Sequence, residues 1–524
     1  MRIGFATIYS WRPHIEHLNY LADMVRRGGH EAVFLTCNAD LSTCYTRELR
    51  HIRPDWQECL LCRIGGVCSY SAKGVSSIGD LSPAAPGDVP DARMWSLSSA
   101  STLGRFESDA DFGSVEFLSL VERLTPVVAR AYTAATTWIE SLAIDALVVF
   151  NGRIDVTRAI FEAAIAKNIP VASLERTWFG DGLQLLPQEN CLGLRSVTQM
   201  VGKWAGKPLC ADQARLAARL ISSRFLCCNH SEWRAYNLDA RILPWPVSDA
   251  KTKILLIPGS RNEIWGHPDW RESWGHPLSA YDALMRHFGW HPRDLVLRCH
   301  PNWAENIGTA GGRRAEEIYV QWAQRRGVTV IPSYDKASTL GLIEQSDAVV
   351  VASGSAALEA ASLGKQVIGI APANYQSAGI RDDATTPQKL AGITLRRDQT
   401  PGQAIEDEAR VRMNALRFAY TIAYRVPQYV QQVRCVTPTR YLYRDDGDPE
   451  RLIKLLRHRE LEPDDATFSA DTVEETLITE LMLHHQWSKL MFDRDWERDY
   501  KPMQRRPIFR VVDFVRSHMR HGDR

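Results

Sequence analysis

Short apolar runs alternate with amphipathic stretches along most of the chain. The run 1–8 (MRIGFATI) has the length of a strand, and 14–37 continues as an amphipathic helix, a Gly-Gly break and a second strand. Further along, the helical pattern of 114–142 leads into the apolar strand 145–153 (DALVVFNGR), and a shorter helix leads into the strand 169–176 (IPVASLER). This alternation predicts a parallel sheet with helices on both faces.

A break in this pattern separates two halves of the chain. Prolines and charges accumulate at 237–253 (NLDARILPWPVSDAKTK), and a fresh strand follows in KILLIPGS. From there strands and helices alternate again up to KQVIGIA at 365–371, so the sequence predicts two Rossmann-like, doubly wound domains that face each other across a cleft at the carboxyl ends of their strands. The predicted units are an N-terminal domain at 1–245, a second domain at 246–400 and a helical C-terminal extension at 401–524.

Length and charge agree with this division. A chain of 524 residues is too long for one hydrophobic core. Because 63 basic residues face 62 acidic ones, the net charge of +1 gives no general attraction to nucleic acid or to anionic membranes. The apolar runs are far shorter than the roughly 20 residues that span a bilayer. The N-terminus has no long apolar stretch of the signal-peptide kind, so we expect a cytoplasmic protein.

Two segments have no clear period or an unusual charge. The stretch 69–111 is rich in Ser, Gly, Pro and Ala, which predicts a long surface loop. The C-terminal stretch 505–524 (RRPIFRVVDFVRSHMRHGDR) is basic, and two interpretations stay open for it. One is a solvated surface helix, which the acidic residues nearby favour, and the other is peripheral association with the inner membrane.

The early part of the chain holds a cluster of cysteines. Cys59 and Cys62 have the two-residue spacing of a metal knuckle, and three more cysteines lie close by in the sequence. No second pair of this spacing follows, so reduced thiols are favoured over a metal site.

Two strand ends of the second predicted domain carry residues suited to a phosphate. His300 and Pro301 end the strand DLVLRCHP, and Ser353, Gly354 and Ser355 lead from DAVVVASGS into a helix. Backbone N–H groups at a helix start, together with the serine hydroxyls, make an anion site. A donating imidazole across the gap would complete a phosphate clamp.

Glu359 lies one turn into that helix and could reach a ribose hydroxyl. The alternative for the Ser-Gly-Ser motif is an ordinary helix N-cap without a ligand.

The first predicted domain offers a second group of candidates. Asn151 and Arg153 follow a buried strand, and the guanidinium would suit the carboxylate of an acidic sugar, although Asn-Gly can also simply make the turn. Glu175 ends the next strand, where it is either half of an ion pair or a general base facing the cleft. His14 and His17, after the first strand, either line the acceptor side or serve packing.

This order of motifs resembles the nucleotide-binding half of the GT-B glycosyltransferases. More narrowly, it is similar to the bacterial capsule polysaccharide synthesis family that includes transferases of Kdo (3-deoxy-manno-octulosonic acid). The stretches HPNW, SDAVVVASGSAALEAASLGKQVIGIAPANYQSAGI, VVFNGR and SLERTWFGDGLQLLP carry the likeness, which covers roughly residues 145–385. The serine-containing helix start is shared with other cytidylyl and uridylyl GT-B enzymes.

The resemblance implies roles for these residues. In that family a His-Pro motif and a downstream serine motif hold the CMP of CMP-Kdo, which implies that His300 and the 353–355 motif bind the donor nucleotide. His300 would also neutralise charge on the departing phosphate. Glu175 matches the family's glutamate, which favours the general-base interpretation. The unit 1–245 would then bind the acceptor and the unit 246–400 the nucleotide sugar.

The stretch LLIPGSRNEIWGHPDW departs from the family pattern. Retaining Kdo transferases carry a glutamine after Pro-Gly and, a few residues later, an aspartate proposed as the nucleophile. Here Ser260 replaces the glutamine, and Glu263 is the nearest acid. Whether Glu263 or Asp269 substitutes, or no covalent step occurs, stays open. Arg261, between these positions, is predicted to contact the substrate.

The favoured function is transfer of Kdo, or a related acidic sugar, from a CMP-activated donor onto a bacterial surface polysaccharide or glycolipid. One alternative is a UDP-sugar-dependent GT-B transferase or a UDP-sugar 2-epimerase, and another is a non-catalytic polysaccharide-assembly protein with the same fold. No P-loop, HExxH or GxSxG motif is present, so the sequence lacks the motifs of nucleotide hydrolysis, zinc proteolysis and serine-hydrolase chemistry. The nucleotide sugar is a substrate, so we expect no separate cofactor and no nucleic-acid partner.

Overall fold

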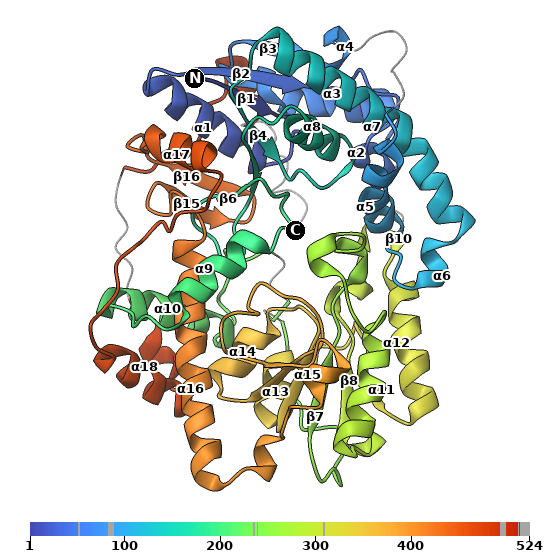
Figure 1. Cartoon of the computed structure of the whole chain (residues 1–524), viewed down its shortest axis with the longest axis vertical. Coiled ribbons are helices and arrows are strands. Elements are labelled where there is room, and N and C mark those ends of the chain that lie inside the picture. The colour runs from blue at the N-terminus through green and yellow to red at the C-terminus, as the bar shows by residue number, and fades with distance from the viewer. Residues whose placement is uncertain are drawn as a thin grey trace.

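Two α/β domains lie one above the other in the computed structural model, and a C-terminal extension runs along one side of both (Figure 1). The structure describes residues 1–50, 53–81, 89–233, 236–237, 239–307, 310–492, 499–511 and 513. In this part of the chain, none of the helices combines the length and the apolar composition needed to cross a membrane.

The first domain is built on a six-stranded sheet. Its strand order is β3-β2-β1-β4-β5-β6, and all neighbouring strands are parallel except the edge pair β5 and β6. The strands are β1 (Arg2–Ala6), β2 (Glu31–Thr36), β3 (Val75–Ser77), β4 (Ala146–Phe150), β5 (Val171–Glu175) and β6 (Gln184–Pro187). The helices before β6 are α1 (His14–Arg27), α2 (Tyr45–Arg50), α3 (Asp55–Gly65), α4 (Ile78–Leu81), α5 (Ala92–Gly104), α6 (Asp109–Phe112), α7 (Val115–Ser141) and α8 (Asp155–Ala166).

The second domain repeats the same winding. Its parallel sheet has the order β11-β8-β7-β12-β13-β14. The strands are β7 (Ile254–Ile257), β8 (Leu295–Arg298), β11 (Thr329–Ile331), β12 (Ala348–Val351), β13 (Gln366–Gly369) and β14 (Asp382–Asp383), and a small ribbon joins β9 (Asn306–Ile307) and β10 (Ala310–Gly311). Its helices are α11 (Pro277–Phe288), α12 (Arg313–Arg326), α13 (Thr339–Gln345), α14 (Ala356–Ser362) and α15 (Pro387–Leu390). The predicted pair of doubly wound domains is thereby confirmed.

The central strands are buried on both faces, which explains their continuous apolar sequences. Every residue of β4 (ALVVF) is at most 4% exposed. On the neighbouring strand, Gly4 is required by a close approach of helix α7: a Cβ there would lie 2.6 Å from the ring of Trp138. The hydrophobic pattern and the single glycine thus fix how this sheet meets its longest helix.

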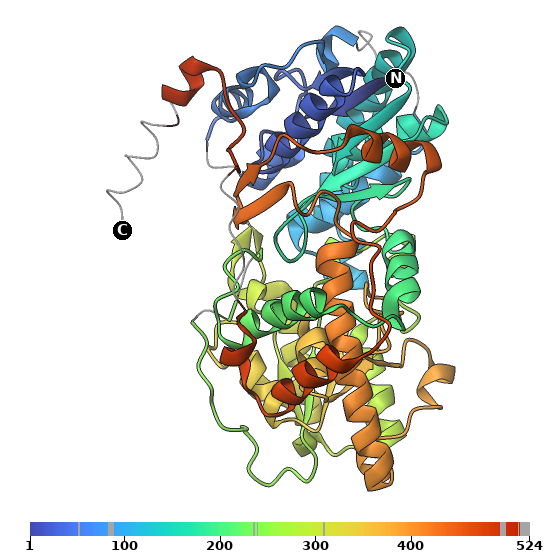
Figure 2. The same ribbon diagram turned by 90° about the vertical axis from the view of Figure 1, so that its left-hand side faces the viewer.

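The chain crosses between the domains several times after β6. Helices α9 (Arg195–Ala205), α10 (Ala211–Phe225), α16 (Pro401–Tyr420) and α18 (Val473–Leu483) pack in the core of the second domain. The hairpin of β15 (Val433–Thr437) and β16 (Arg440–Tyr443), with α17 (Pro449–His458), packs in the core of the first. Figure 2 shows this orange and red extension running from one domain to the other. The extension was predicted as helical, so the hairpin is an addition to that prediction.

The prediction of a long surface loop at 69–111 is wrong. This segment contains β3, and its helix α5 is largely buried against α7 and α8. Serine hydroxyls can enter this interface because they have partners: Ser96 donates to the carbonyl of Ala92 in its own helix, and Ser99 accepts from the N–H of Asp155. Residues 82–88 of the segment lie outside the described residues.

A buried polar network after α5 docks the first domain onto the second. The Glu107 carboxylate accepts from the N–H of Arg261 at 3.1 Å and from the Tyr319 hydroxyl at 3.2 Å. The Arg261 guanidinium donates to the Glu107 carbonyl at 2.8 Å and lies 3.4 Å from the Glu272 carboxylate. Burial raises the pKa of Glu107 to about 8 and that of Glu272 to about 7, although Arg261 opposes both shifts. Two carboxyl groups therefore share one buried cation.

We expect the stability of Glu107→Gln to depend less on pH than that of the wild type. The folded-state pKa of Glu107 lies above the value of about 4.3 in an unfolded chain. Its contribution to stability is therefore complete below the unfolded pKa and is lost as the pH rises through the folded pKa. Glutamine stays neutral, so between about pH 5 and pH 8.5 the variant should lose about 1–2 kcal/mol less stability than the wild type.

The measurement is the melting temperature and the urea midpoint at both pH values. Glu406→Gln, a change of an exposed carboxylate, is the matched control and should behave as wild type. Parallel pH profiles for Glu107→Gln and wild type would contradict the assignment.

Candidate functional site

A cleft of about 1560 Å³ lies between the two domains and is lined by both of them and by the C-terminal extension. Five predicted site residues border it: Asn151, Arg153 and Glu175 from the first domain, and Glu263 and His300 from the second. The carboxyl ends of parallel strands meet at one edge of each sheet, and the two edges face one another here.

Asn151 both makes the turn after β4 and holds the carboxylate that follows β5. Its backbone is left-handed (φ 63°), and its side-chain oxygen accepts from the N–H groups of Arg153 and Ile154. Its side-chain nitrogen donates to Glu175 at 3.1 Å. The turn interpretation and the site interpretation therefore describe the same side chain.

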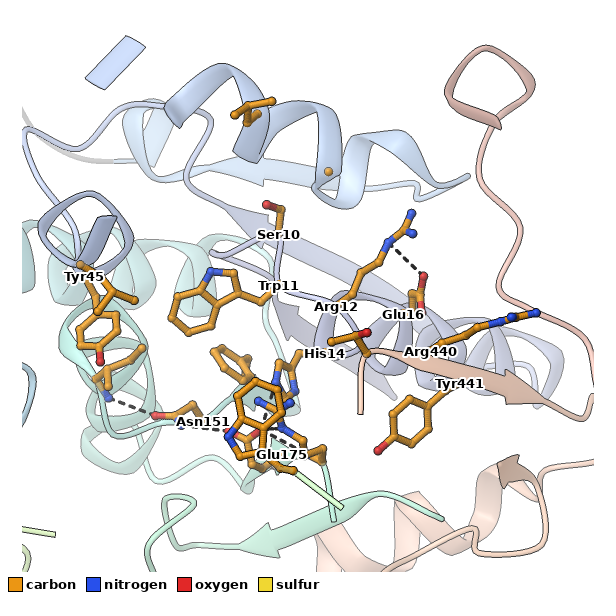
Figure 3. A pocket seen from close by; sticks show the side chains of 18 of the residues that line it. Ser10, Trp11, Arg12, His14, Glu16, Tyr45, Asn151, Glu175, Arg440 and Tyr441 are labelled. Atoms are coloured by element: carbon orange, nitrogen blue, oxygen red, sulfur yellow. Dashed lines mark hydrogen bonds and ion pairs between the residues drawn. The ribbon is translucent and has the colours of Figure 1, made fainter. Parts of the chain in front are cut away.

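Glu175 is oriented by three donors (Figure 3). Besides Asn151, it accepts from the N–H of Arg176 at 3.1 Å, and the Nε2 atom of His14 lies 3.1 Å from its Oε1. Burial raises the pKa of Glu175 from its usual value, with Arg176 opposing the shift. Burial also lowers the pKa of His14, so the imidazole is neutral and donates from Nε2. This arrangement leaves an oriented carboxylate with increased basicity at the cleft.

His14 and His17 have different surroundings. His14 lines the cleft, whereas His17 is fully buried and its Nδ1 lies 2.9 Å from the hydroxyl of Tyr443 in the hairpin. The packing interpretation thus applies to His17, which connects α1 to the C-terminal extension.

The Arg153 guanidinium crosses from one domain toward the other. It donates to the hydroxyls of Ser98 and Thr102 in α5 and to the carbonyl of Glu263 at 3.1 Å. Among the described residues it forms no ion pair with a carboxylate. Its charge is therefore available to an anionic ligand in the cleft.

Three neighbouring strands of the second domain end in polar residues, of which His300 borders the cleft. His300 follows β8, Ser260 follows β7 and Ser353 follows β12, and β7 lies between the other two strands. Two strand spacings put His300 and Ser353 roughly 10 Å apart along the sheet edge. At this separation the two side chains are too far apart to grip one phosphate oxygen between them, and of the two only His300 lines the cleft.

His300 also acts as a cap. Its Nδ1 accepts from the N–H of Asn302 at 3.2 Å, at the start of the short helix Pro301–Ala304. Pro301 occupies the first position of this helix, where its missing N–H costs nothing. Because Nδ1 accepts, a neutral ring carries its hydrogen on Nε2, which is a donor suited to phosphate oxygens.

The Ser-Gly-Ser motif is not an ordinary N-cap, because Ser355 makes no side-chain capping bond at the start of α14. Its hydroxyl accepts from Arg224 at 2.9 Å, and Ser353 lies beside Gly259, where a Cβ would be 2.9 Å from the serine oxygen. The motif and Gly354 do not line the cleft described above.

Glu359 is held in a buried ion-pair cluster. The Arg224 guanidinium contacts both Glu359 and Glu232, and all three side chains are at most 10% exposed. Burial raises the pKa of Glu232, while the two carboxylates raise the pKa of Arg224 against the effect of burial. A buried pair of this kind has an evident structural role, and a ribose contact by Glu359 stays a prediction.

The stretch after β7 distributes its charged residues over different surroundings. Glu263 is exposed and lines the cleft, whereas Arg261 is buried in the docking network with Glu107. Asp269 accepts from the N–H of Leu194 at 2.9 Å, so it binds the backbone at the start of α9. Of these three, Glu263 alone borders the cleft, and Arg261 does not reach it.

Several cationic side chains of the cleft were not predicted. Eight described arginines line it against four carboxylates, Glu16, Glu175, Glu263 and Asp513. The arginines are Arg12, Arg50, Arg53, Arg153, Arg176, Arg440, Arg505 and Arg510. Arg12 is paired with Glu16, whereas Arg440 projects from β16 and has no ion-pair partner among the described residues (Figure 3). Their positions in the sequence are too far apart for local patterns to group them.

The early cysteines are free thiols in the structure. Cys59 accepts from Arg47, and Cys62 donates to the carbonyl of Ile8 in the loop after β1. Within the described ranges, no three His, Cys, Asp or Glu side chains lie close enough together to hold a metal ion.

Two facing Rossmann-like domains with a cleft between their strand ends are the fold of the GT-B enzymes. No family model and no curated protein matches the sequence. Among solved structures, the chain is similar to the KpsC β-Kdo 2,4 transferase of Thermosulfurimonas dismutans (15% identity, TM-score 0.33, 65% of this chain and 87% of that one). It is also similar to the UDP-GlcNAc 2-epimerase of Neisseria meningitidis bound to UDP-GlcNAc (13% identity, TM-score 0.28, 87% of this chain and 100% of that one).

Removing the cation of the buried cluster should unfold the second domain more easily. Arg224→Met leaves Glu232 and Glu359 buried without a partner, and we expect a loss of about 3–5 kcal/mol. Urea unfolding measures this loss. Arg215→Met on the same helix removes a more exposed ion pair and should cost less than about 1 kcal/mol.

Combining Arg224→Met with Glu232→Gln and Glu359→Gln should recover part of the loss, because the unpaired charges are gone. Equal, small effects of Arg224→Met and Arg215→Met would show that the cluster does not stabilise the fold.

Proposed function

We propose that this protein is a glycosyltransferase that moves Kdo, or a related acidic sugar, from a CMP-activated donor onto a glycan or glycolipid acceptor. The observation that carries the proposal is the shared cleft: an oriented carboxylate of raised pKa, Glu175, and the imidazole of His300 border it from opposite domains. An acceptor would meet Glu175 on one side, and a donor phosphate would meet His300 on the other.

The charge of the cleft supports an anionic donor. A CMP-activated acidic sugar carries a phosphate and a carboxylate, and the excess of arginines over acids matches both. We assign the sugar carboxylate to Arg153, because its guanidinium forms no ion pair in the described part of the chain and offers a planar fork of donors beside Glu263.

The reaction can follow two stereochemical courses with these residues. If it inverts, Glu175 removes the proton of the acceptor hydroxyl as the sugar–phosphate bond breaks and CMP leaves. If it retains, the exposed carboxylate of Glu263 attacks the anomeric carbon and displaces CMP; the acceptor hydroxyl then attacks the same carbon, loses its proton and releases the Glu263 carboxylate. In both courses, donors such as His300 stabilise the charge that develops on the departing phosphate.

Nucleotide titration tests the donor assignment. A ligand at about 100 times its Kd stabilises the folded state by about 2.7 kcal/mol. If CMP binds more tightly than UDP or CDP, it should raise the melting temperature more than they do at the same concentration. In His300→Ala, we expect a melting temperature without nucleotide that is lowered only by the loss of the cap on Asn302, a reduced CMP shift and loss of CMP release from CMP-Kdo. His291→Ala, a change of an exposed histidine that also precedes a proline, is the matched control.

A larger shift with UDP would favour a UDP-sugar enzyme of the same fold. Binding of CMP without CMP release in the presence of acceptors would favour the non-catalytic assembly protein. Full transfer by His300→Ala would contradict the role of the imidazole.

We expect Glu175→Gln to lower kcat by about 100-fold or more with a smaller change in KM, because a general base acts in the transition state. The wild-type rate should rise with pH through a pKa above 4.5, since only the deprotonated carboxyl accepts a proton. Rates measured from pH 4 to 8 check this. If Glu263→Gln abolishes transfer while Glu175→Gln still transfers the sugar, the reaction follows the retaining course through a covalent intermediate rather than the inverting one.

A further inference from the structure

Helix α3 and the C-terminal segment, which lie next to each other, both carry exposed apolar side chains. On α3, Trp56, Leu60 and Leu61 are 65%, 47% and 40% exposed, and in the helical residues 507–511 Ile508 and Val511 are 72% and 64% exposed. These five residues are called the apolar rim below. Large apolar side chains exposed in one region of the surface mark an interaction site.

The two segments of the apolar rim are held together by Arg505. Its side chain is 6% exposed, and it donates to the hydroxyl of Ser69 at 3.1 Å and to the carbonyl of Ile64 at the end of α3. The N–H of Arg506 donates to the carbonyl of Ser69 at 2.9 Å. Figure 2 shows the red C-terminal helical segment beside the blue helices of the first domain. Segments from both ends of the sequence are thus held side by side.

The charges around the apolar rim are positive. Arg63 on α3 and Arg506 and Arg510 in the C-terminal segment form no ion pair with a carboxylate among the described residues. The acids nearby are paired: Asp55 lies 3.6 Å from Arg47, and Asp513 lies 2.6 Å from Arg505. An apolar face with arginines beside it is complementary to an anionic lipid surface, which combines acyl chains with negative headgroups.

The apolar rim also borders the cleft. Leu61 and Arg510 line the cleft together with Ile64 and Arg505. An acceptor anchored in a bilayer would therefore reach the site without leaving the membrane surface. An extended protein partner would instead need complementary acidic side chains at this mouth, where it would obstruct the entry of substrate.

We propose that the apolar rim docks the protein on an anionic lipid bilayer, so that a lipid-linked acceptor enters the cleft from the membrane side. This proposal rests on the proposed function, since it specifies how that function's acceptor is presented. For residues 505–511 and 513 it favours the membrane-surface interpretation of the C-terminal stretch over the solvated helix, and it adds α3 to the contact. Residues 512 and 514–524 of that stretch lie outside the described residues.

Vesicle co-sedimentation of the full chain tests the docking. We expect binding to vesicles of phosphatidylcholine with phosphatidylglycerol, and little binding to phosphatidylcholine alone. Binding should weaken at high salt, because the Debye length falls from about 10 Å at 0.1 M to about 3 Å at 1 M. The variant Trp56→Ser/Leu60→Ser/Ile508→Ser should bind at least about tenfold more weakly, because its apolar contacts with the acyl boundary are removed.

The matched control is Val115→Ser/Ile405→Ser, which removes two apolar side chains that are 84% and 67% exposed outside the rim and should bind vesicles as wild type does. Arg63→Gln/Arg506→Gln should reduce binding to anionic vesicles and its salt dependence. All of these residues are exposed, so the variants should keep the wild-type melting temperature.

Equal vesicle binding by the wild type and the rim variant, or no binding by the wild type at low salt, would overturn the docking proposal. The CMP-induced melting shift distinguishes this failure from failure of the proposed function. A rim variant that keeps the CMP shift and loses vesicle binding supports the docking alone, whereas a wild type that binds vesicles but no nucleotide contradicts the glycosyltransferase assignment and leaves the docking surface in place.

Discussion

The docking of one buried segment of the first domain onto the loops of the second determines the geometry of the cleft. The Arg105 guanidinium donates to the carbonyl of Asn302 at 2.8 Å, two residues after His300. In α5, the hydroxyls of Ser101 and Thr102 donate to the carbonyl of Asn262 at 3.0 and 3.1 Å. These bonds join the loops after β7 and β8 to the end of a helix that is itself packed against α7 and α8 of the first domain. The two sides of the site are therefore held by hydrogen bonds that are costly to break in a buried interface.

The same helix positions Arg153. Its guanidinium donates to Thr102, whose hydroxyl also contacts Asn262, and it then reaches the carbonyl of Glu263. A change in the distance between the domains would break these bonds together. The hydrogen bonds of Arg153 consequently report the domain arrangement, and any contact of its guanidinium with a ligand would be coupled to that arrangement.

Much of the fold and part of the site follow from the sequence, because both depend on a regular rule. Alternating strands and helices predict parallel sheets, and parallel sheets place the residues that follow their strands at one edge. That rule brings Asn151, Glu175 and His300 to a single cleft. It does not depend on which side chains pack where, so local patterns suffice. The functional roles of these residues remain predictions that the experiments above address.

What the sequence does not predict depends on distant partners. A serine-rich stretch predicts an exposed loop if its hydroxyls can form hydrogen bonds only with water. In α5 the hydroxyls instead donate to carbonyls of the same helix and of the second domain. The sequence predicts a substrate contact for Arg261, but Glu107, 154 positions earlier, binds its backbone N–H and its guanidinium. The C-terminal arginines reach the cleft because Arg505 docks on a carbonyl 441 positions away. Such pairings are set by tertiary structure, for which a single sequence carries no local signal.

The charge distribution limits what the cleft itself can select. The whole chain has a net charge of +1, whereas the described lining carries eight arginines against four acids. Burial raises the pKa of one of those acids, Glu16, to about 7, which weakens its negative charge near neutral pH.

A concave cationic surface attracts anions as a class and speeds their arrival, but it attracts a cytidine and a uridine nucleotide equally. Discrimination between such donors must come from hydrogen bonds to the base and the sugar, because a wrong ligand that leaves one buried polar group unpaired loses about 1–3 kcal/mol. The arginines therefore favour anions in general, and selection between nucleotides must come from the other polar groups that line the cleft.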